Sequence, residues 1–272
     1  MKDYILSWAL RKRKYQTFFE RLYRFAVRGM NYGFGGGVHQ SGEIEAIRYV
    51  TKRLGNEAVI FDVGANIGNY SKELLKHFES PIIYCFEPSK KTFTTLENNL
   101  KQLRGINFCN FGFGKDNETV ELFSDKDASG LASLYNRRLD HLKIEMSLKE
   151  DIKIMRIDDF CEERNIVAID FLKLDIEGHE LAALQGAKEM LNRGRIKYIQ
   201  FEFGGCNIDS RTYFQDFWYL LSDRYSIYRI VKDGLTPIKE YRETYEIFST
   251  INYLAELKHG LAAEFNVGNP SN

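Results

Sequence analysis

The sequence predicts an α/β fold with a mainly parallel, seven-stranded sheet that carries helices on both faces. Short apolar runs alternate with longer segments of helical periodicity, which is the pattern of a covered parallel sheet. A turn bracketed by Gly64 and Gly68 follows the first core run. Acidic residues recur where such runs end, at the sheet edge where ligands bind in this class of fold.

Each apolar run and each periodic segment is assigned to one element. Strands are expected at 58–63, 82–87, 106–111, 168–174, 196–203, 226–232 and 246–253, and helices at 41–54, 67–78, 89–103, 178–192 and 210–222. Ser41 is the expected N-cap of the first of these helices. No helix separates the last two strands, so one of them is expected to run antiparallel at the edge of the sheet.

The chain is expected to divide into three regions. Residues 1–40 form a helical extension that ends in a glycine-rich, flexible linker at 31–37. Residues 41–260 form the α/β domain, and its insertion at 117–157 is expected to act as a substrate lid, because long insertions are often functional. Residues 261–272 are expected to be a flexible tail.

Residues 1–30 are unusually basic and aromatic, and two interpretations remain open. The segment could lie as a helix on a membrane surface, or it could pack on the α/β domain with its basic face in water. The residues concerned are Tyr4, Ile5, Trp8, Leu10, Arg11, Lys12, Arg13, Lys14, Phe18, Phe19, Arg21, Leu22, Tyr23, Arg24, Phe25 and Arg28.

Composition narrows the class of partner and compartment. With 38 basic and 38 acidic residues the formal net charge is +0, so nothing favours a nucleic-acid partner. No apolar run reaches the roughly 18 residues of a membrane span. The four cysteines lack metal-site spacing, and Cys85 and Cys109 are expected to be buried. A cytoplasmic protein is expected, with residues 1–30 as a candidate contact to the inner face of the membrane.

Two segments together predict a nucleoside site. Residues 58–68, AVIFDVGANIG, are a strand and glycine-bracketed turn, and residues 82–88, IIYCFEP, are a strand that ends in Glu87. Glycine lets the backbone approach a ligand closely, and an acid after the second strand accepts hydrogen bonds from a ribose diol. The alternative is an ordinary strand–turn–helix in which Asn66 caps the helix.

The turn chemistry favours S-adenosylmethionine (SAM) over a dinucleotide. The pattern Asp62-x-Gly64-x-x-x-Gly68 has fewer glycines than G-x-G-x-x-G, and its acid would repel a phosphate. SAM carries a sulfonium, an ammonium and a ribose diol. The residues expected to bind it are Asp62, Gly64, Ala65, Asn66, Gly68, Glu87 and Pro88.

A second polar group follows the strand at 168–174. Residues 175–180 read DIEGHE, and Asp175, His179 and Glu202 are the candidate catalytic residues. Alternatively, Asp175 and Glu177 are acids that a helix N-terminus stabilises, and His179 is a polar first-turn residue. Lys173 lies within the buried strand and needs a carboxylate partner, which Asp158 or Glu202 could supply.

A metal ion is one further possibility. Asp175 and Glu202 end neighbouring strands, which lie about 4.8 Å apart in a sheet. Two carboxylates that close either share a proton or bind a hard cation such as Mg²⁺. The alternative is that Glu202 simply neutralises Lys173.

Four segments resemble one known family. They are VIFDVGANIGNYS, CFEPSKKTFTTLENNL, IDFLKLDIEGHELAALQGAKEML and FSTINYLAEL, and together they resemble the FkbM family of SAM-dependent methyltransferases from about Glu43 to Leu257. The resemblance implies the class I, Rossmann-like methyltransferase fold. It also implies O-methylation of a sugar or a polyketide-type product, often in polysaccharide biosynthesis. It places Asn110 and Gly112 near the adenine.

The predicted reaction is therefore in-line transfer of a methyl group to a hydroxyl of a small molecule or glycan. Asp175, together with His179 or Glu202, is expected to remove the hydroxyl proton. Two other functions stay open: methylation of a lipid or protein side chain, and a catalytically idle scaffold that only binds SAM.

Overall fold

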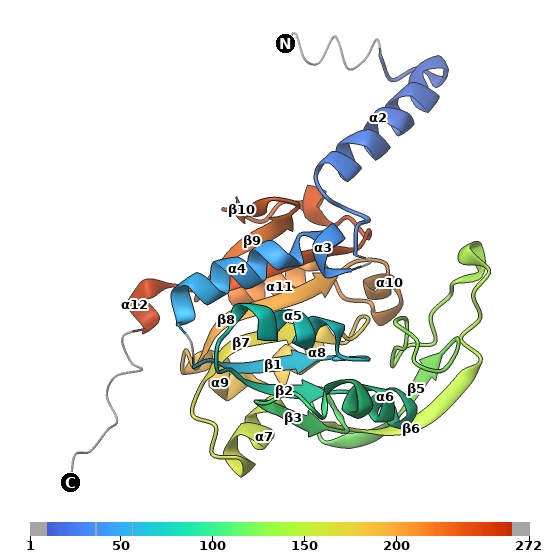
Figure 1. Cartoon of the computed structure of the whole chain (residues 1–272). Coiled ribbons are helices and arrows are strands. Elements are labelled where there is room, and N and C mark those ends of the chain that lie inside the picture. The colour runs from blue at the N-terminus through green and yellow to red at the C-terminus, as the bar shows by residue number, and fades with distance from the viewer. Residues whose placement is uncertain (1–9, 36, 56, 263–272) are drawn as a thin grey trace.

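An eight-stranded sheet forms the body of the protein, one strand more than predicted. The computed structural model describes residues 10–35, 37–55 and 57–262, and the eight strands are those found within these residues (Figure 1). In spatial order the strands are β10 (Gly234–Ile238), β9 (Tyr225–Val231), β11 (Ile251–Leu257), β8 (Ile196–Phe203), β7 (Ile169–Leu174), β1 (Val59–Val63), β2 (Ile82–Phe86) and β3 (Ile106–Cys109).

The last strands depart from the predicted arrangement. Of the last two predicted strands, β11 is the antiparallel one, because it pairs antiparallel with both β8 and β9, but it lies inside the sheet rather than at the edge. The edge is nevertheless antiparallel, because β10 forms a hairpin with β9. Periodicity missed β10, which holds a glycine and Pro237 in five residues; proline is tolerated in strands at such an edge. β11 also begins later than predicted, because the Glu246 carboxylate binds the N–H groups of Phe214 and Gln215 and stays outside the strand.

Helices cover both faces of the sheet, as predicted. Apolar side chains of α4, α5 and α6 pack against Ile60 and Ile83 on one face, and those of α7, α8, α9 and α11 pack near Phe61 and Phe86 on the other. The helices are α2 (Gln16–Gly29), α3 (Val38–Ser41), α4 (Glu43–Leu54), α5 (Asn69–His77), α6 (Lys90–Leu100), α7 (Ile157–Glu163), α8 (Glu180–Gln185), α9 (Lys188–Asn192), α10 (Cys206–Ser210), α11 (Phe214–Leu221) and α12 (His259–Ala262).

Two predicted helices change at glycines. The helix expected at 178–192 divides into α8 and α9 at Gly186, where a Cβ would lie 2.0 Å from the carbonyl oxygen of Gly114. The helix expected at 41–54 begins only at Glu43, with Gly42 as N-cap at a φ of 88°. Ser41 still contributes, because its hydroxyl accepts a hydrogen bond from the N–H of Glu43 at 3.2 Å.

The insertion at 117–157 builds most of a second, smaller sheet. In spatial order its strands are β4 (Gly112–Phe113), β6 (Leu148–Met155) and β5 (Glu118–Ser124). Leu122, Ile152 and Ile154 form its apolar cluster. This sheet lies beside β2, β3 and α6 at one end of the molecule (Figure 1).

The N-terminal helix α2 does not pack on the domain as one interpretation held. It projects away from the body, and within the described structure Val27 is its only buried residue (Figure 1). The first residues of the glycine-rich segment are docked rather than free: Tyr32 is 1% exposed, and the N–H of Gly33 donates to the carbonyl of Thr250 at 2.8 Å.

The structure also bears on the predictions for the cysteines, for membrane-spanning segments and for the two ends of the chain. The four cysteines are buried free thiols, as predicted for Cys85 and Cys109. Within the described residues, no helix combines the length and apolarity needed to cross a bilayer. Residues 1–9 and 263–272, which include Tyr4, Ile5 and Trp8 and most of the predicted tail, lie outside the described part of the chain.

Candidate active site

A cavity of about 330 Å³ opens at the C-terminal ends of β1, β2 and β7, within the usual size range of ligand pockets. Its wall combines the turn after β1, the loop after β7, the segment before α4 and the inner face of the insertion. The lining residues include Gly35, Glu43, Gly64, Ala65, Asn66, Asn69, Tyr70, Glu87, Pro88, Gly112, Phe113, Leu122, Ser129, Leu134, Ile152, Ile154, Lys173, Asp175, Glu177 and His179.

The N–H groups of the turn after β1 are bound within the protein. Those of Gly64 and Ala65 both donate to the carbonyl of Phe86 at 3.0 Å, and that of Asn66 donates to Glu87 at 3.0 Å. Besides the predicted approach to a ligand, the fold itself requires a glycine here. Gly64 has a φ of 77°, and a Cβ there would lie 1.9 Å from the carbonyl oxygen of Asp175. Gly64 therefore allows the ends of β1 and β7 to meet.

Glu87 lies where the sequence placed a ribose-binding acid. It lines the cavity at 6% exposure, and its two carboxylate oxygens accept the N–H groups of Asn66 and Ser89, each at 3.0 Å. Burial raises the pKa of Glu87 to about 7, against the opposing effect of these hydrogen bonds. Each oxygen keeps a lone pair for a ligand hydroxyl.

Three residues predicted to bind the cofactor are not among the described residues that line the cavity. Asp62 is fully buried and accepts the Ser71 hydroxyl at 2.6 Å. Gly68 allows close packing of α5 on α6, because a Cβ there would lie 2.7 Å from Leu100. The Asn110 side chain donates to the carbonyl groups of Glu87 and Pro88. These residues support the site without facing it.

Lys173 links the two acidic strand ends. Its Nζ lies 3.4 Å from Asp62 and 3.2 Å from Asp175. The predicted partners, Asp158 and Glu202, are therefore wrong. Asp158 instead binds the N–H groups at the start of α9. Burial alone would lower the pKa of Lys173, but the Asp175 and Asp62 carboxylates raise it above its usual value. The lysine stays charged.

Sequence reasoning missed a polar network at the same cavity. Gln200, fully buried in β8, donates to Glu43 at 2.7 Å and accepts the Tyr70 hydroxyl at 2.8 Å. Glu43 and Tyr70 line the cavity. Burial raises the pKa of Glu43 to about 6. The one available signal was a glutamine between the apolar residues Ile199 and Phe201 of a predicted buried strand.

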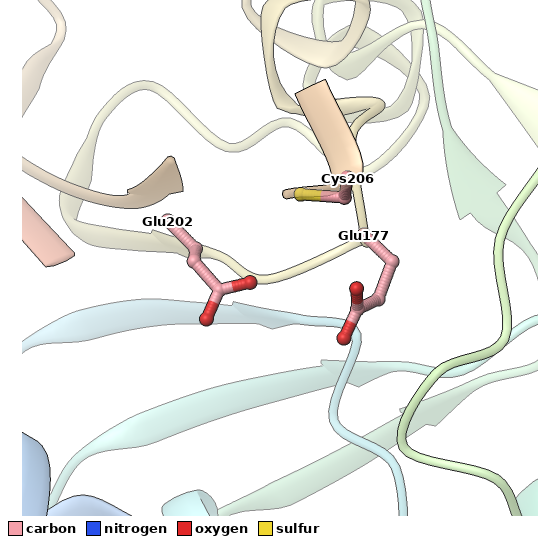
Figure 2. A group of neighbouring side chains, drawn as sticks. All are labelled: Glu177, Glu202 and Cys206. Atoms are coloured by element: carbon pink, nitrogen blue, oxygen red, sulfur yellow. The ribbon is translucent and has the colours of Figure 1, made fainter. Parts of the chain in front are cut away.

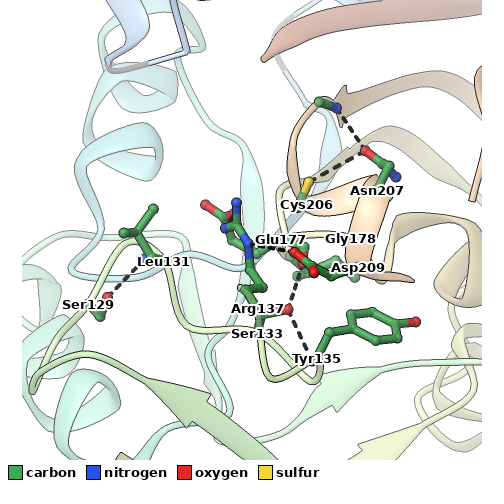
Figure 3. Close-up of polar contacts among 12 residues, drawn as sticks. Ser129, Leu131, Ser133, Tyr135, Arg137, Glu177, Gly178, Cys206, Asn207 and Asp209 are labelled. Carbon is green, nitrogen blue, oxygen red and sulfur yellow. Dashed lines mark hydrogen bonds and ion pairs between the residues drawn. The ribbon is translucent and has the colours of Figure 1, made fainter. Parts of the chain in front are cut away.

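Side chains of the insertion anchor it to the loop after β7 (Figure 3). The Ser133 hydroxyl donates to the carbonyl of Glu177 at 2.7 Å, and Arg137 forms a buried ion pair with the Glu177 carboxylate. The Tyr135 hydroxyl lies 3.1 Å from Nδ1 of His179. Burial lowers the pKa of His179 to about 4, so its ring is neutral at pH 7.

Glu202 lies beside the cavity and is not among its described lining residues. Ligand atoms of Glu177, Glu202 and Cys206 lie within 4.8 Å of one another, and Asp175 is not part of this group (Figure 2). Burial raises the pKa of Glu202 well above its usual value, and the Asp175 and Glu177 carboxylates add to the effect. Of the three candidate catalytic residues, the structure brings Asp175 and His179 to the cavity.

The profile of the FkbM methyltransferase domain matches residues 62–228. The chain belongs to the FkbM methyltransferase family. This match spans Asp62, Glu87, Asp175 and Glu202 and the whole insertion. The family match agrees with the α/β fold and with the cavity at the strand ends.

Three relatives of this FkbM-family chain share less than 30% identity with it. The 2-O-methyltransferase NoeI of Sinorhizobium fredii is 24% identical over 53% of this chain, the hexuronic acid methyltransferase AglP of Haloferax volcanii is 23% identical over 60%, and the 31-O-demethyl-FK506 methyltransferase FkbM of Streptomyces tacrolimicus is 27% identical over 48%. The matches span 60% to 64% of these relatives' own lengths. Among solved structures, an rRNA methylase of Streptococcus thermophilus aligns with 78% of this chain and 93% of its own at 12% identity and a TM-score of 0.40.

Proposed function

We propose that this protein transfers the methyl group of SAM to a hydroxyl group of a sugar in a glycan or of a related natural product. The observation that carries the proposal is one cavity that both Glu87 and Asp175 line, from strands on either side of β1. Two strand spacings separate them, about 10 Å, which leaves room for donor and acceptor in one site. The names of two relatives, a 2-O-methyltransferase and a hexuronic acid methyltransferase, support a sugar acceptor.

The charge around the cavity supports SAM as the donor. Glu43, Glu87 and Asp175 line it with Lys173 as their counter-charge within the described lining, whereas Glu177 is paired with Arg137. Such a surplus of carboxyl groups favours the sulfonium and ammonium of SAM and would repel a phosphate. We place the ribose diol on Glu87 and the methionine ammonium toward Glu43.

Asp175 is the proposed general base. In the reaction the methyl carbon–sulfur bond breaks as the carbon–oxygen bond forms, the sulfur keeps the bonding electrons, and the hydroxyl proton passes to the Asp175 carboxylate. This side chain is 37% exposed, lines the cavity and is oriented by Lys173. His179, neutral and held by Tyr135, is proposed to accept a hydrogen bond that orients the acceptor.

The donor groups present do not fit the predicted Mg²⁺ site at Asp175 and Glu202. Mg²⁺ requires near-octahedral oxygen ligands. Asp175 is paired with Lys173, whereas Glu202 is grouped with Glu177 and Cys206, whose thiol is kept neutral because burial raises its pKa. A neutral thiol is a poor ligand for this cation. We therefore propose that Asp175, and not a metal ion, activates the acceptor hydroxyl.

Chelation tests this part of the proposal. Protein treated with EDTA and then desalted should retain full methyl transfer, and added Mg²⁺ or Mn²⁺ should not raise it. The Asp175→Asn variant should lose about 10²–10⁴-fold in kcat while SAM binding stays within a few-fold. Activity that disappears on chelation and returns with Mg²⁺ would replace Asp175 by a metal in the mechanism.

The reaction itself is tested with SAM labelled at the methyl group and a panel of monosaccharides, oligosaccharides and extracted glycolipids. Label that enters a saccharide and survives mild alkali supports an O-methyl ether on a hydroxyl. Label lost to alkali indicates a carboxyl ester, as a uronic acid acceptor could give. Transfer only to lipid or protein, or tight SAM binding without transfer in a cell extract, would favour the two other functions.

A further inference from the structure

Helix α2 exposes large apolar side chains to solvent. It projects from the body of the molecule (Figure 1), and within the described structure Val27 is its only buried residue. Phe25 is 76% exposed, Phe18 61%, Tyr23 59% and Leu22 48%. Exposed aromatic groups this close together mark an interaction surface rather than an ordinary helix face.

The apolar and basic side chains of α2 occupy separate faces. At about 100° per residue, the apolar groups fall within an arc of about 120° and three arginines fall within a neighbouring arc of about 60°. The apolar face comprises Phe18, Phe19, Leu22, Phe25 and Ala26, and the basic face comprises Arg21, Arg24 and Arg28.

Charge is concentrated at this end of the chain. Residues 10–30 contain seven basic residues and one acidic residue, the glutamate at position 20, although the whole chain is neutral. The remainder of the protein therefore has a net negative charge. An anionic surface would attract the helix and repel the body, which sets how the molecule approaches it.

We propose that α2 is an interfacial helix that docks this protein on the surface of an anionic phospholipid bilayer. Basic and aromatic faces on one helix are the signature of such binding. The 14 residues of α2 span about 21 Å, too short for a hydrocarbon core of about 30 Å, so the helix lies in the plane of the interface. A second copy of α2 would face it with the same basic residues, which favours lipid over self-association.

The junction between α2 and the domain would fix the orientation of the domain relative to the membrane surface. The Asn31 side chain donates to the carbonyl groups of Ser41 and Ile230, and the Tyr32 hydroxyl contacts that of Tyr253 at 3.3 Å. Gly35, a few residues later, lines the cavity. A bound helix would therefore hold the domain through a short, packed connection.

Vesicle flotation of the full chain tests the proposal. It should float with vesicles of phosphatidylcholine and phosphatidylglycerol at 3:1, and at least tenfold less with phosphatidylcholine alone or in 0.5 M salt, where charges are screened. Two triple variants should each lose binding at least tenfold: Arg21→Glu with Arg24→Glu and Arg28→Glu, and Phe18→Ser with Leu22→Ser and Phe25→Ser.

Matched controls separate the helix from general effects of charge and apolar exposure. The charge control changes the net charge as much as the triple arginine variant does, through Lys101→Glu, Arg104→Glu and Lys188→Glu. The apolar control removes exposed apolar groups elsewhere, through Val167→Ser and Leu142→Ser. Both controls should float like the unaltered protein, and all variants should keep the same thermal midpoint. Equal flotation of α2 variants and controls would overturn the proposal. So would a failure to float together with concentration-dependent dimers that the serine variant abolishes, since that would identify a second copy as the partner.

Discussion

The two walls of the cavity are held by different kinds of contact. On the wall formed by the ends of β1, β2 and β7, main-chain groups contact main-chain groups: the N–H of Gly64 binds the carbonyl of Phe86, and that of Asp175 binds the carbonyl of Val63. On the wall formed by the insertion, side chains make the anchoring contacts, through Ser133 and Tyr135. The close approach of the backbone at Gly64 leaves no room for a side chain there, whereas side-chain anchors can change singly.

This difference would suit the two tasks of the proposed methyl transfer, holding the donor and selecting the acceptor. The donor is the same in every turnover, so a wall built from packed backbone can hold it in one geometry. The names of two relatives, a 2-O-methyltransferase and a 31-O-demethyl-FK506 methyltransferase, indicate different acceptors. We expect substitutions in the first wall to affect folding and SAM binding, and substitutions in the second to affect the acceptor.

The largest effect is expected at Gly64. In Gly64→Ala the new Cβ would lie 1.9 Å from the carbonyl of Asp175 at a φ of 77°, which should lower the free energy of unfolding by about 2–5 kcal/mol. Gly130→Ala is the matched control, because that glycine also lines the cavity and its Cβ would meet no heavy atom within 4 Å. Denaturant unfolding compares them. Equal stability of the two variants would break the proposed distinction.

The next effect concerns Glu87 and the donor. Glu87→Ala should weaken SAM binding by about 1.5–3 kcal/mol, the scale of a charge-assisted hydrogen bond. Isothermal titration measures it, with Glu150→Ala as a control because Glu150 lies nearby and is not among the described residues that line the cavity. Unchanged affinity in Glu87→Ala would remove Glu87 from the ribose site.

SAM affinity should also depend on pH through the same residue. Burial raises the pKa of Glu87 to about 7, and ribose hydroxyls donate to the ionised form. Binding therefore lowers this pKa and releases a proton, so affinity should fall as pH drops below about 7, by at most tenfold per pH unit. Isothermal titrations between pH 5.5 and 8.5 should show that SAM affinity depends less steeply on pH in Glu87→Gln than in the unaltered protein. An identical slope in both proteins would assign the dependence to another group.

The smallest effect is expected in the insertion. Tyr135→Phe removes the hydroxyl that holds His179, which should raise the activation barrier by about 0.5–1.5 kcal/mol and leave SAM affinity unchanged. Tyr219→Phe, at an exposed position, is the control. The measurement is kcat together with SAM affinity. A loss of SAM binding in Tyr135→Phe would show that the two walls do not act separately.

Much of the wall formed by the ends of β1, β2 and β7 could be predicted from sequence. Strand β1, the turn to Gly68, helix α5 and the acid at Glu87 all follow from local rules: apolar runs form buried strands, and glycine tolerates positive φ. For Gly64 the structure adds a reason that local rules could not supply. Its closest neighbour is the carbonyl of Asp175, more than a hundred residues later in the chain.

The tertiary structure alone decided which acids face the cavity. Asp62 and Glu202 end strands as Glu87 and Asp175 do, yet Asp62 is buried against Lys173 and Glu202 lies beside Glu177 and Cys206. Glu43, which no motif indicated, is brought in by a helix.

By itself the sequence determined the family, the alternation of strands and helices, and the amphipathic pattern of α2. It did not determine that β11 lies between β8 and β9, that β10 closes the edge, or that α2 stands away from the domain. The physical reason is the range of the interactions. Backbone conformation and side-chain periodicity depend on neighbours along the chain, whereas strand order, ion-pair partners and burial depend on groups that only folding brings together.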